Sequence, residues 1–193
     1  MLGRTHELVG LGFGLAVAIN ADKIGLEKNA VNTVVLTAGS LVGSLLPDID
    51  HTSSIAGKNA FFVSWPIAIL NKFFSFLKRH SKGTMRKFWG YIAKMFGHRG
   101  ICHSGLLWIA LLLYSYFYGN MNSYLGILIF GLMVGGISHL CADSLNPSGI
   151  PWLLPISAKR FRIAKISTAS NAENIFRWVV ILLDIALLIL FVM

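Results

Sequence analysis

The stretch His98-Arg99-Gly100-Ile101-Cys102-His103-Ser104 lies where a long basic loop meets the start of an apolar segment. It places two imidazoles, a guanidinium and a hydroxyl at the mouth of a hydrophobic helix, where polar side chains cost free energy unless something binds them. Three further polar clusters occupy similar positions: Thr5-His6-Glu7, Asp48-Ile49-Asp50-His51, and Ser138-His139 with Asp143. This pattern predicts that the four clusters meet at one site.

The composition indicates an all-α, polytopic membrane protein. Of the 193 residues, 55% are hydrophobic and only 13% are charged, which is too apolar for a soluble domain of this size. We find no linker and no repeat, so residues 1–193 are expected to form a single domain. A net charge of +9 would favour nucleic acid as the partner of a soluble protein. Here the basic residues lie between apolar segments, where they are expected to set the topology and to attract anionic membrane lipids instead.

The apolar segments predict about four to five transmembrane helices with additional interfacial or re-entrant helices. The predicted spans are residues 8–21, 31–46, 101–118, 124–142 and 175–193. Phe61–Leu77 is aromatic but contains Pro66 and Lys72, and Arg86–Phe96 is basic and amphipathic. The first segment is therefore expected to be an interfacial or re-entrant helix rather than a full span, and the second to lie on the lipid surface.

The charges predict the orientation of the spans. Residues 52–100 contain no acidic residue but many lysines and arginines, so the positive-inside rule places this loop in the cytoplasm. The start of the first span, the end of the second, the start of the third and the end of the fourth then lie on the cytoplasmic side. Each polar cluster occupies one of these four ends, although the charge rule was not used to choose the clusters.

Two of the clusters offer good metal ligands. Asp48 and Asp50 beside His51 combine hard and borderline ligands that suit Zn, Mn, Fe or Mg, whereas the alternative is a solvated helix end. His139 and Asp143 are four residues apart, so they project from one helix face and could share an ion. By itself this spacing is weak, because many surface helices contain it by chance.

The remaining candidates are less specific. His98 and His103 are five residues apart, and a bend at Gly100 would be needed to bring them together. Arg99 either binds a phosphate group or is simply the last positive charge before the membrane. His6, taken alone, would be an interfacial histidine.

Four other residues of interest have no clear place in this pattern. Cys102 and Cys141 are expected to be small buried residues, with thiolate coordination of a metal as the alternative. His80 has only cations around it and is expected to be solvated. Asp184 is an acid in the last span and has no motif around it.

Together these motifs resemble the YdjM-like family of bacterial inner-membrane proteins, which are described as predicted metal-dependent hydrolases. The motifs include Leu46-Pro47-Asp48-Ile49-Asp50-His51, His98-Arg99-Gly100 with His103-Ser104, and Ser138-His139 with Asp143. The resemblance implies a multi-pass protein of the bacterial cytoplasmic membrane. The positions that match the family pattern are His6, Asp48, Asp50, His51, His98, His103, His139 and Asp143.

The ligand set is larger than one tetrahedral zinc needs, which favours a centre of one or two divalent ions, Zn or Mn. A looser likeness to zinc-dependent phospholipase C favours a phosphoester in a lipid or lipid-linked substrate. In that hypothesis, a carboxylate such as Asp48 takes a proton from water, and Arg99, Arg160 or Arg162 holds the phosphate. Two alternatives remain: a transporter of metal ions or protons, and a non-catalytic protein that uses metal only to tie its helix ends together.

Overall fold

Two pairs of glycines bring the central helices into close contact. In the computed structural model, which describes residues 1–192, α2 (Ala30–Gly43) packs along α7 (Tyr124–Asp143). The glycines are Gly39 and Gly43 on α2, and Gly131 and Gly135 on α7. A Cβ atom on Gly39 would lie 2.6 Å from a carbonyl oxygen of α7, and one on Gly135 would collide with the backbone of α2. Spaced four residues apart, these glycines form the small-residue interface that is typical of helix pairs in membranes.

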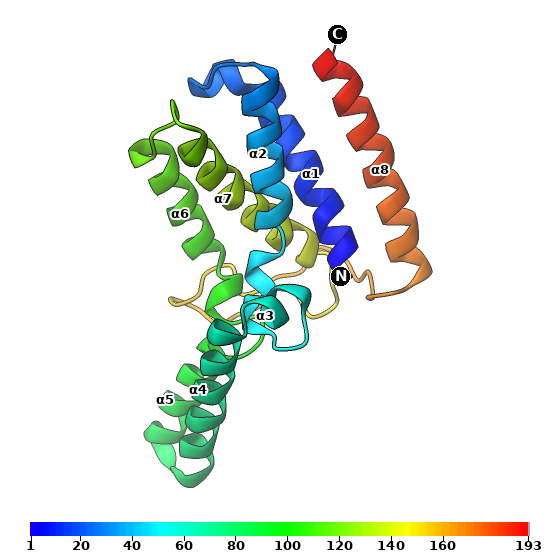
Figure 1. Ribbon diagram of the computed structural model, residues 1–193. Helices are drawn as coiled ribbons and strands as arrows, with labels where there is room; N and C mark the ends of the chain where they lie inside the picture. Colours follow the sequence, from blue (N-terminus) through cyan, green and yellow to red (C-terminus); the bar gives the residue numbers. More distant parts are fainter. Residues whose placement is uncertain (193) are drawn as a thin grey trace.

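The other long helices stand beside this pair (Figure 1). α1 (Gly3–Ile19) contacts α2, α7 and α8 (Asn171–Val192), while α6 (Gly105–Tyr118) packs on α7. The core between them is apolar and contains buried Leu36, Ile127, Phe130 and Val134. The bundle thus holds the ends of four helices near one another.

Three helical segments are long and apolar enough to cross a membrane: Ala30–Asp50, Tyr124–Asp143 and Asn171–Val192. This confirms the predicted all-α membrane fold, whereas the number of passes stays a prediction. α6 has 14 residues and is about 21 Å long at about 1.5 Å per residue, less than the roughly 30 Å of a bilayer core. The span predicted at residues 101–118 is thus longer than the helix observed, which starts at Gly105. Met193, at the end of the predicted last span, lies outside the described residues.

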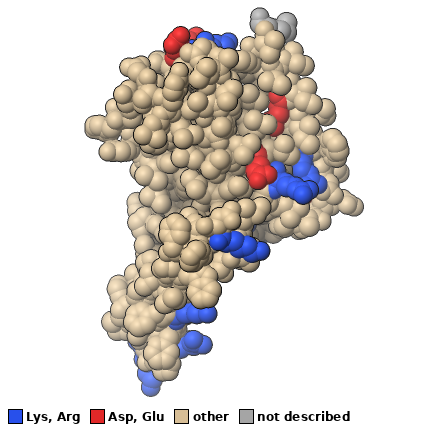
Figure 2. Space-filling model, in the orientation of Figure 1, with Lys and Arg blue, Asp and Glu red and all other residues tan. Residues whose placement is uncertain are grey.

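A helical hairpin extends away from the bundle at the end opposite the chain's C-terminus (Figure 1). It consists of α4 (Phe61–His80) and α5 (Gly83–Met95), which pack against each other. The ring of Phe74 stacks between those of Trp89 and Phe96, with centroids 5.8 and 5.6 Å away. Figure 2 shows basic side chains along this hairpin. Both helices were predicted with nearly these bounds; their placement on the lipid surface stays a prediction.

Short elements connect the helix ends beneath the bundle. They are η1 (Ala21–Ile24), η2 (Leu46–Asp50), α3 (Ile55–Asn59) and η3 (Ile101–His103). The loop between α7 and α8 adds a single bridge between Ile150 and Phe161. Most of the polar clusters identified in the sequence lie on or next to these connections.

Asp184 is buried between helices. Its side chain packs on α1 at Gly12, where a Cβ atom would collide with it, and its Oδ2 has no hydrogen-bond partner among the described residues. It lines an apolar cavity of about 470 Å³ between α1, α2 and α8. The sequence offered no partner for this acid, and the residues described here provide none for Oδ2.

Candidate metal centre

The end of α7 contributes His139 and Asp143, both almost fully buried. Close packing of α7 on α2 places the carbonyl oxygen of Ser44 2.6 Å from Nδ1 of His139. Because a carbonyl oxygen can only accept a hydrogen bond, Nδ1 must carry the proton, and in the neutral ring the lone pair is then on Nε2. An acceptor behind the ring is how proteins orient a histidine that ligates a metal.

The acidic cluster follows the end of α2. Pro47 opens the turn η2, which carries Asp48 and the buried Asp50. Asp48 Oδ1 lies 3.5 Å from Nε2 of His103 and 3.7 Å from Nε2 of His139. The end of α7 and the turn η3 each direct an imidazole, and the turn η2 directs a carboxylate, at the same point.

A bend at Gly100 brings His98 and His103 together, as the sequence predicted. A Cβ atom at Gly100 would collide with a preceding backbone carbonyl, and Arg99 adopts a left-handed φ of 59°, which costs a non-glycine residue about 1 kcal/mol or more. Both imidazoles then reach Asp50: Nδ1 of His98 lies 3.1 Å from Oδ1, and Nδ1 of His103 lies 3.4 Å from Oδ2.

Helix α1 supplies His6. Its sequence context alone suggested an interfacial histidine, but the side chain is buried. Its ring stacks on that of His139 with centroids 3.8 Å apart, and its Nε2 lies 3.5 Å from Oδ1 of Asp143. The neighbouring Thr5 hydroxyl donates to Glu173 at 2.8 Å, which ties α1 to the start of α8. Glu173 was not predicted from the sequence, although an acid at the start of an apolar helix was a visible signal.

Seven of the eight predicted ligands form three overlapping groups whose ligand atoms lie within 4.8 Å of one another. The groups are His6, Asp48 and His139; His103, His139 and Asp143; and Asp48, Asp50 and His98. Nε2 of His103, Nε2 of His139 and Oδ2 of Asp50 are buried without a hydrogen-bond partner in the described chain. Buried polar atoms normally have partners, so these free atoms and this set of nitrogen and oxygen donors fit a divalent metal such as zinc or manganese.

His51 and Cys102 stand apart from these groups. Within residues 1–192, His51 belongs to none of the three; its Nδ1 lies 2.8 Å from the hydroxyl of Ser53, and its ring meets the edge of His98. Its role as a ligand stays a prediction. Burial, aided by the charge of Asp50, raises the pKa of the Cys102 thiol to about 12. Cys102 thus stays protonated, although it is half-buried rather than fully buried as predicted.

Arg99 and Asn146 hold Asp143 in place. Nη2 of Arg99 lies 2.7 Å from Oδ2 of Asp143, while Nη1 bonds the Ser148 hydroxyl and lies 3.3 Å from the carbonyl oxygen of Gly149. The amide of Asn146 donates to the other carboxylate oxygen of Asp143 at 2.7 Å. The guanidinium is therefore fixed beside the ligand groups, and Asn146 is a second residue that the sequence analysis missed.

A pocket of about 460 Å³ gives access to the centre. Its polar lining includes His6, Asp48, His51, His98, Arg99 and Asp143. The side chain of His98 is 43% exposed, whereas those of His103 and His139 are fully buried. The ligand groups thus have a closed side within the bundle and an open side where a substrate could enter.

Comparison with known proteins places the chain in a family. The family model described as YdjM inner membrane protein matches residues 1–193. The chain therefore belongs to the YdjM inner membrane protein family. Family membership and the apolar helices both support a location in the inner membrane.

Two YdjM relatives are each 32% identical over 160 residues: the inner membrane proteins YdjM of Escherichia coli strain K12 and of Shigella flexneri. The match covers 78% of this chain but only 65% of either relative. The uncharacterized protein YvsG of Bacillus subtilis strain 168 is 27% identical over 178 residues, covering 91% of this chain and 86% of that protein. No solved structure matches this chain.

Metal binding is expected to strengthen as the pH rises from 7 to 9. Burial opposes the charged form of His103, but the favourable contacts with the neighbouring carboxylates of Asp48 and Asp50 outweigh it and raise its pKa to about 9. In the metal-free protein, the protonated ring therefore stabilises the fold. This contribution is fully present below pH 6.5, the ordinary pKa of histidine, and is lost as the pH rises through about 9. A metal needs the neutral ring, so binding at pH 7 must release this proton.

The measurement is a zinc titration of chelator-treated protein at pH 7, 8 and 9. Apparent affinity is expected to rise by up to about tenfold per pH unit for one released proton. An affinity that does not change over this range would show that His103 does not ligate the ion.

Proposed function

We propose that this chain is a membrane-embedded, metal-dependent hydrolase that cleaves a phosphoester in a lipid or lipid-linked substrate. The observation that supports this most strongly is the overlap of three His/Asp groups, one of them fully buried, beside an open pocket lined by a fixed arginine. A purely structural metal site would normally be closed, whereas catalytic sites keep one side open.

The ligand groups suit two ions better than one. Together the three groups offer seven donor residues, more than the four ligands that one tetrahedral zinc would hold. When bound, a pair of divalent ions stabilises the charge on an attacked phosphoryl group. Zinc and manganese are both compatible with imidazole and carboxylate donors.

Two residues of the chain have separate tasks in this proposal. The Asp48 side chain is 24% exposed and faces the pocket, where it can accept a proton from the attacking water. Arg99 is held by Asp143 and by the turn at Ser148, so its positive charge is positioned before a substrate arrives. Such preorganised charge is effective at stabilising phosphoryl oxygens.

The basic hairpin supports a cytoplasmic orientation of the site. The metal-ligand groups lie at the end of the bundle from which α4 and α5 extend. With these basic helices in the cytoplasm, the pocket faces the inner leaflet, whose anionic lipids the hairpin would attract.

The transporter alternative would need polar groups along the membrane depth. Here the three ligand groups gather at one end, and Asp184 is the one buried acid found farther along the described bundle. The hydrolase proposal accounts better for this concentration of ligands.

We expect metal-dependent hydrolysis of lipid phosphoesters to be faster on anionic than on zwitterionic surfaces, because the basic hairpin attracts anionic amphiphiles. The advantage should shrink as salt is raised from 0.01 to about 0.15 M, where the Debye length falls from about 30 to about 8 Å. The measurement compares phospholipids and polyprenyl phosphates with soluble phosphoesters, with and without added zinc or manganese. Equal turnover of soluble and lipid substrates would overturn the lipid assignment, and no turnover at all would favour the transporter or structural alternatives.

A further inference from the structure

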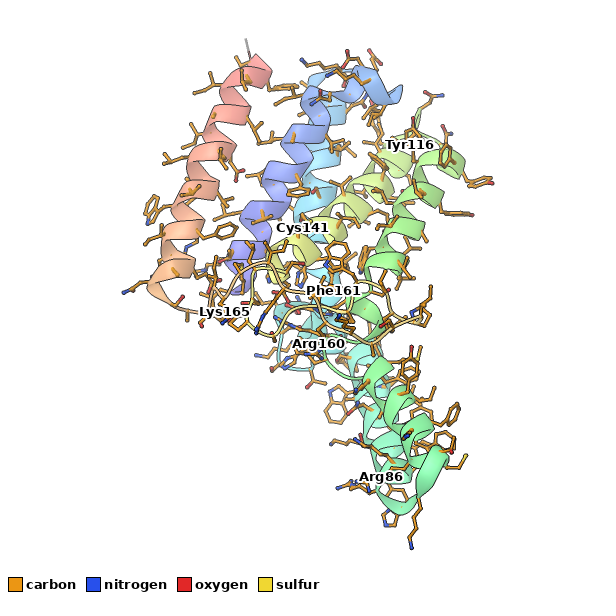
Figure 3. All side chains as sticks on the ribbon, turned by 180° about the vertical axis from the view of Figure 1, so that it is seen from behind. Arg86, Tyr116, Cys141, Arg160, Phe161 and Lys165 are labelled. Atoms are coloured by element: carbon orange, nitrogen blue, oxygen red, sulfur yellow. The ribbon has the colours of Figure 1, made fainter. Side chains whose placement is uncertain are left out.

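A second, strongly basic cleft lies between the hairpin and the loop that follows α7. It consists of two pockets of about 220 and 260 Å³ that share Lys94 and Arg160. Four cationic side chains line it: Lys78, Lys94, Arg99 and Arg160. Figure 3 places Arg160 where the bundle meets the hairpin, far from Arg86 at the hairpin tip.

The charges in this cleft are not neutralised. The residues that line the two pockets include no aspartate or glutamate. Of the four cations, Arg99 pairs with Asp143, whereas Lys78, Lys94 and Arg160 form no salt bridge with any described residue. Like charges gathered in a cleft raise the local potential and attract an anion.

The cleft adjoins the metal centre. Arg99 lines both the metal pocket and the smaller basic pocket, and His98 lines both the metal pocket and the larger one. An anion that extends from the metal centre past Arg99 would therefore meet Lys94 and Arg160 next. The carboxylates lie on the metal side of Arg99, and the unpaired cations lie on the other.

We propose that this cleft binds the second phosphate of a diphosphate group, so that the substrate is a diphosphate ester carried by a lipid. One phosphoryl group would lie at the metal centre and the next between Lys94 and Arg160, with Arg99 between them. The choice of substrate rests on the proposed function. The affinity of the cleft for a diphosphate does not, because it requires only the cations.

The test measures binding of inorganic pyrophosphate and orthophosphate to the full-length protein in neutral detergent, both chelator-treated and zinc-loaded. Charge-assisted hydrogen bonds predict that pyrophosphate binds at least about tenfold more tightly than orthophosphate, and that the double variant Lys94→Gln/Arg160→Gln loses about tenfold or more of this affinity. The matched control is Arg86→Gln/Lys87→Gln, which removes the same charge from the exposed hairpin tip and should change affinity less than about twofold at 0.15 M salt.

Equal losses of pyrophosphate affinity in the two double variants, or no loss in either, would overturn the proposal that this cleft binds a diphosphate. A third arm uses vesicles of phosphatidylglycerol: if Lys94→Gln/Arg160→Gln weakens vesicle binding while pyrophosphate does not bind, the cleft holds bilayer head groups and the diphosphate assignment is wrong. Asp50→Asn separates this inference from the proposed function. Selective pyrophosphate binding by that variant, with unchanged metal content, would contradict the metal centre and leave the cleft standing.

Discussion

His139→Ala is expected to abolish metal-dependent hydrolysis while leaving the protein inserted and helical. The ring belongs to two of the three ligand groups, and its Nε2 is buried without another partner. Loss of a residue that merely orients a ligand typically costs about 10–100-fold in metal affinity or activity, so loss of the ligand itself should cost at least about 100-fold. The measurements are initial rates at saturating zinc and the metal content of the purified variant.

The matched control is His80→Ala. His80 is exposed on α4 and contacts the backbone and ring of Phe76, so it should change neither the rate nor the metal content. Full metal content and full activity in His139→Ala would mean that this ring serves only the packing of the helices.

Gly135→Leu is expected to separate α2 from α7 and to remove the metal centre without touching a ligand. The new side chain would collide with the backbone of α2 at Ser40, and Ser44, one turn farther along, provides the carbonyl that orients His139. Overpacking of this kind costs about 1–3 kcal/mol, and more when the obstacle is backbone. Thermal unfolding in detergent should shift down by several degrees, and metal should be lost with it.

Gly90→Ala provides the comparison, since Gly90 is also helical but its new Cβ would meet the flexible Lys78 side chain at 3.3 Å. It should leave stability unchanged or raise it by up to about 1 kcal/mol. A Gly135→Leu variant as stable and as metal-rich as this control would contradict the close α2–α7 contact.

Local sequence features explain why much of the fold was predictable. The glycines and serines of the second and fourth apolar segments indicated close packing, and His139 and Asp143 had the spacing of one helix face. The bend at Gly100 was predicted because two histidines five residues apart cannot share a straight helix. Each of these arguments uses residues within a few positions of one another.

Other features depend on partners distant in the chain. Ser44 orients His139 across 95 positions, and Glu173 receives the hydroxyl hydrogen of Thr5 across 168. The predicted third span begins at residue 101, whereas α6 starts at Gly105. Ser104 caps this helix, because its hydroxyl accepts a hydrogen bond from the backbone N–H of Leu107 at 3.2 Å. A serine before an apolar run was a helix-start signal, but the apolar residues before it masked the boundary.

The most direct test of the metal centre is an anomalous-scattering map, recorded at the zinc edge, of crystals of the zinc-loaded protein. We predict one or two peaks within about 2.3 Å of Nε2 of His103 or His139 and of oxygens from Asp48, Asp50 or Asp143, with a coordination position open to the pocket. A peak elsewhere, or no peak in crystals kept in saturating zinc, would contradict the proposed centre.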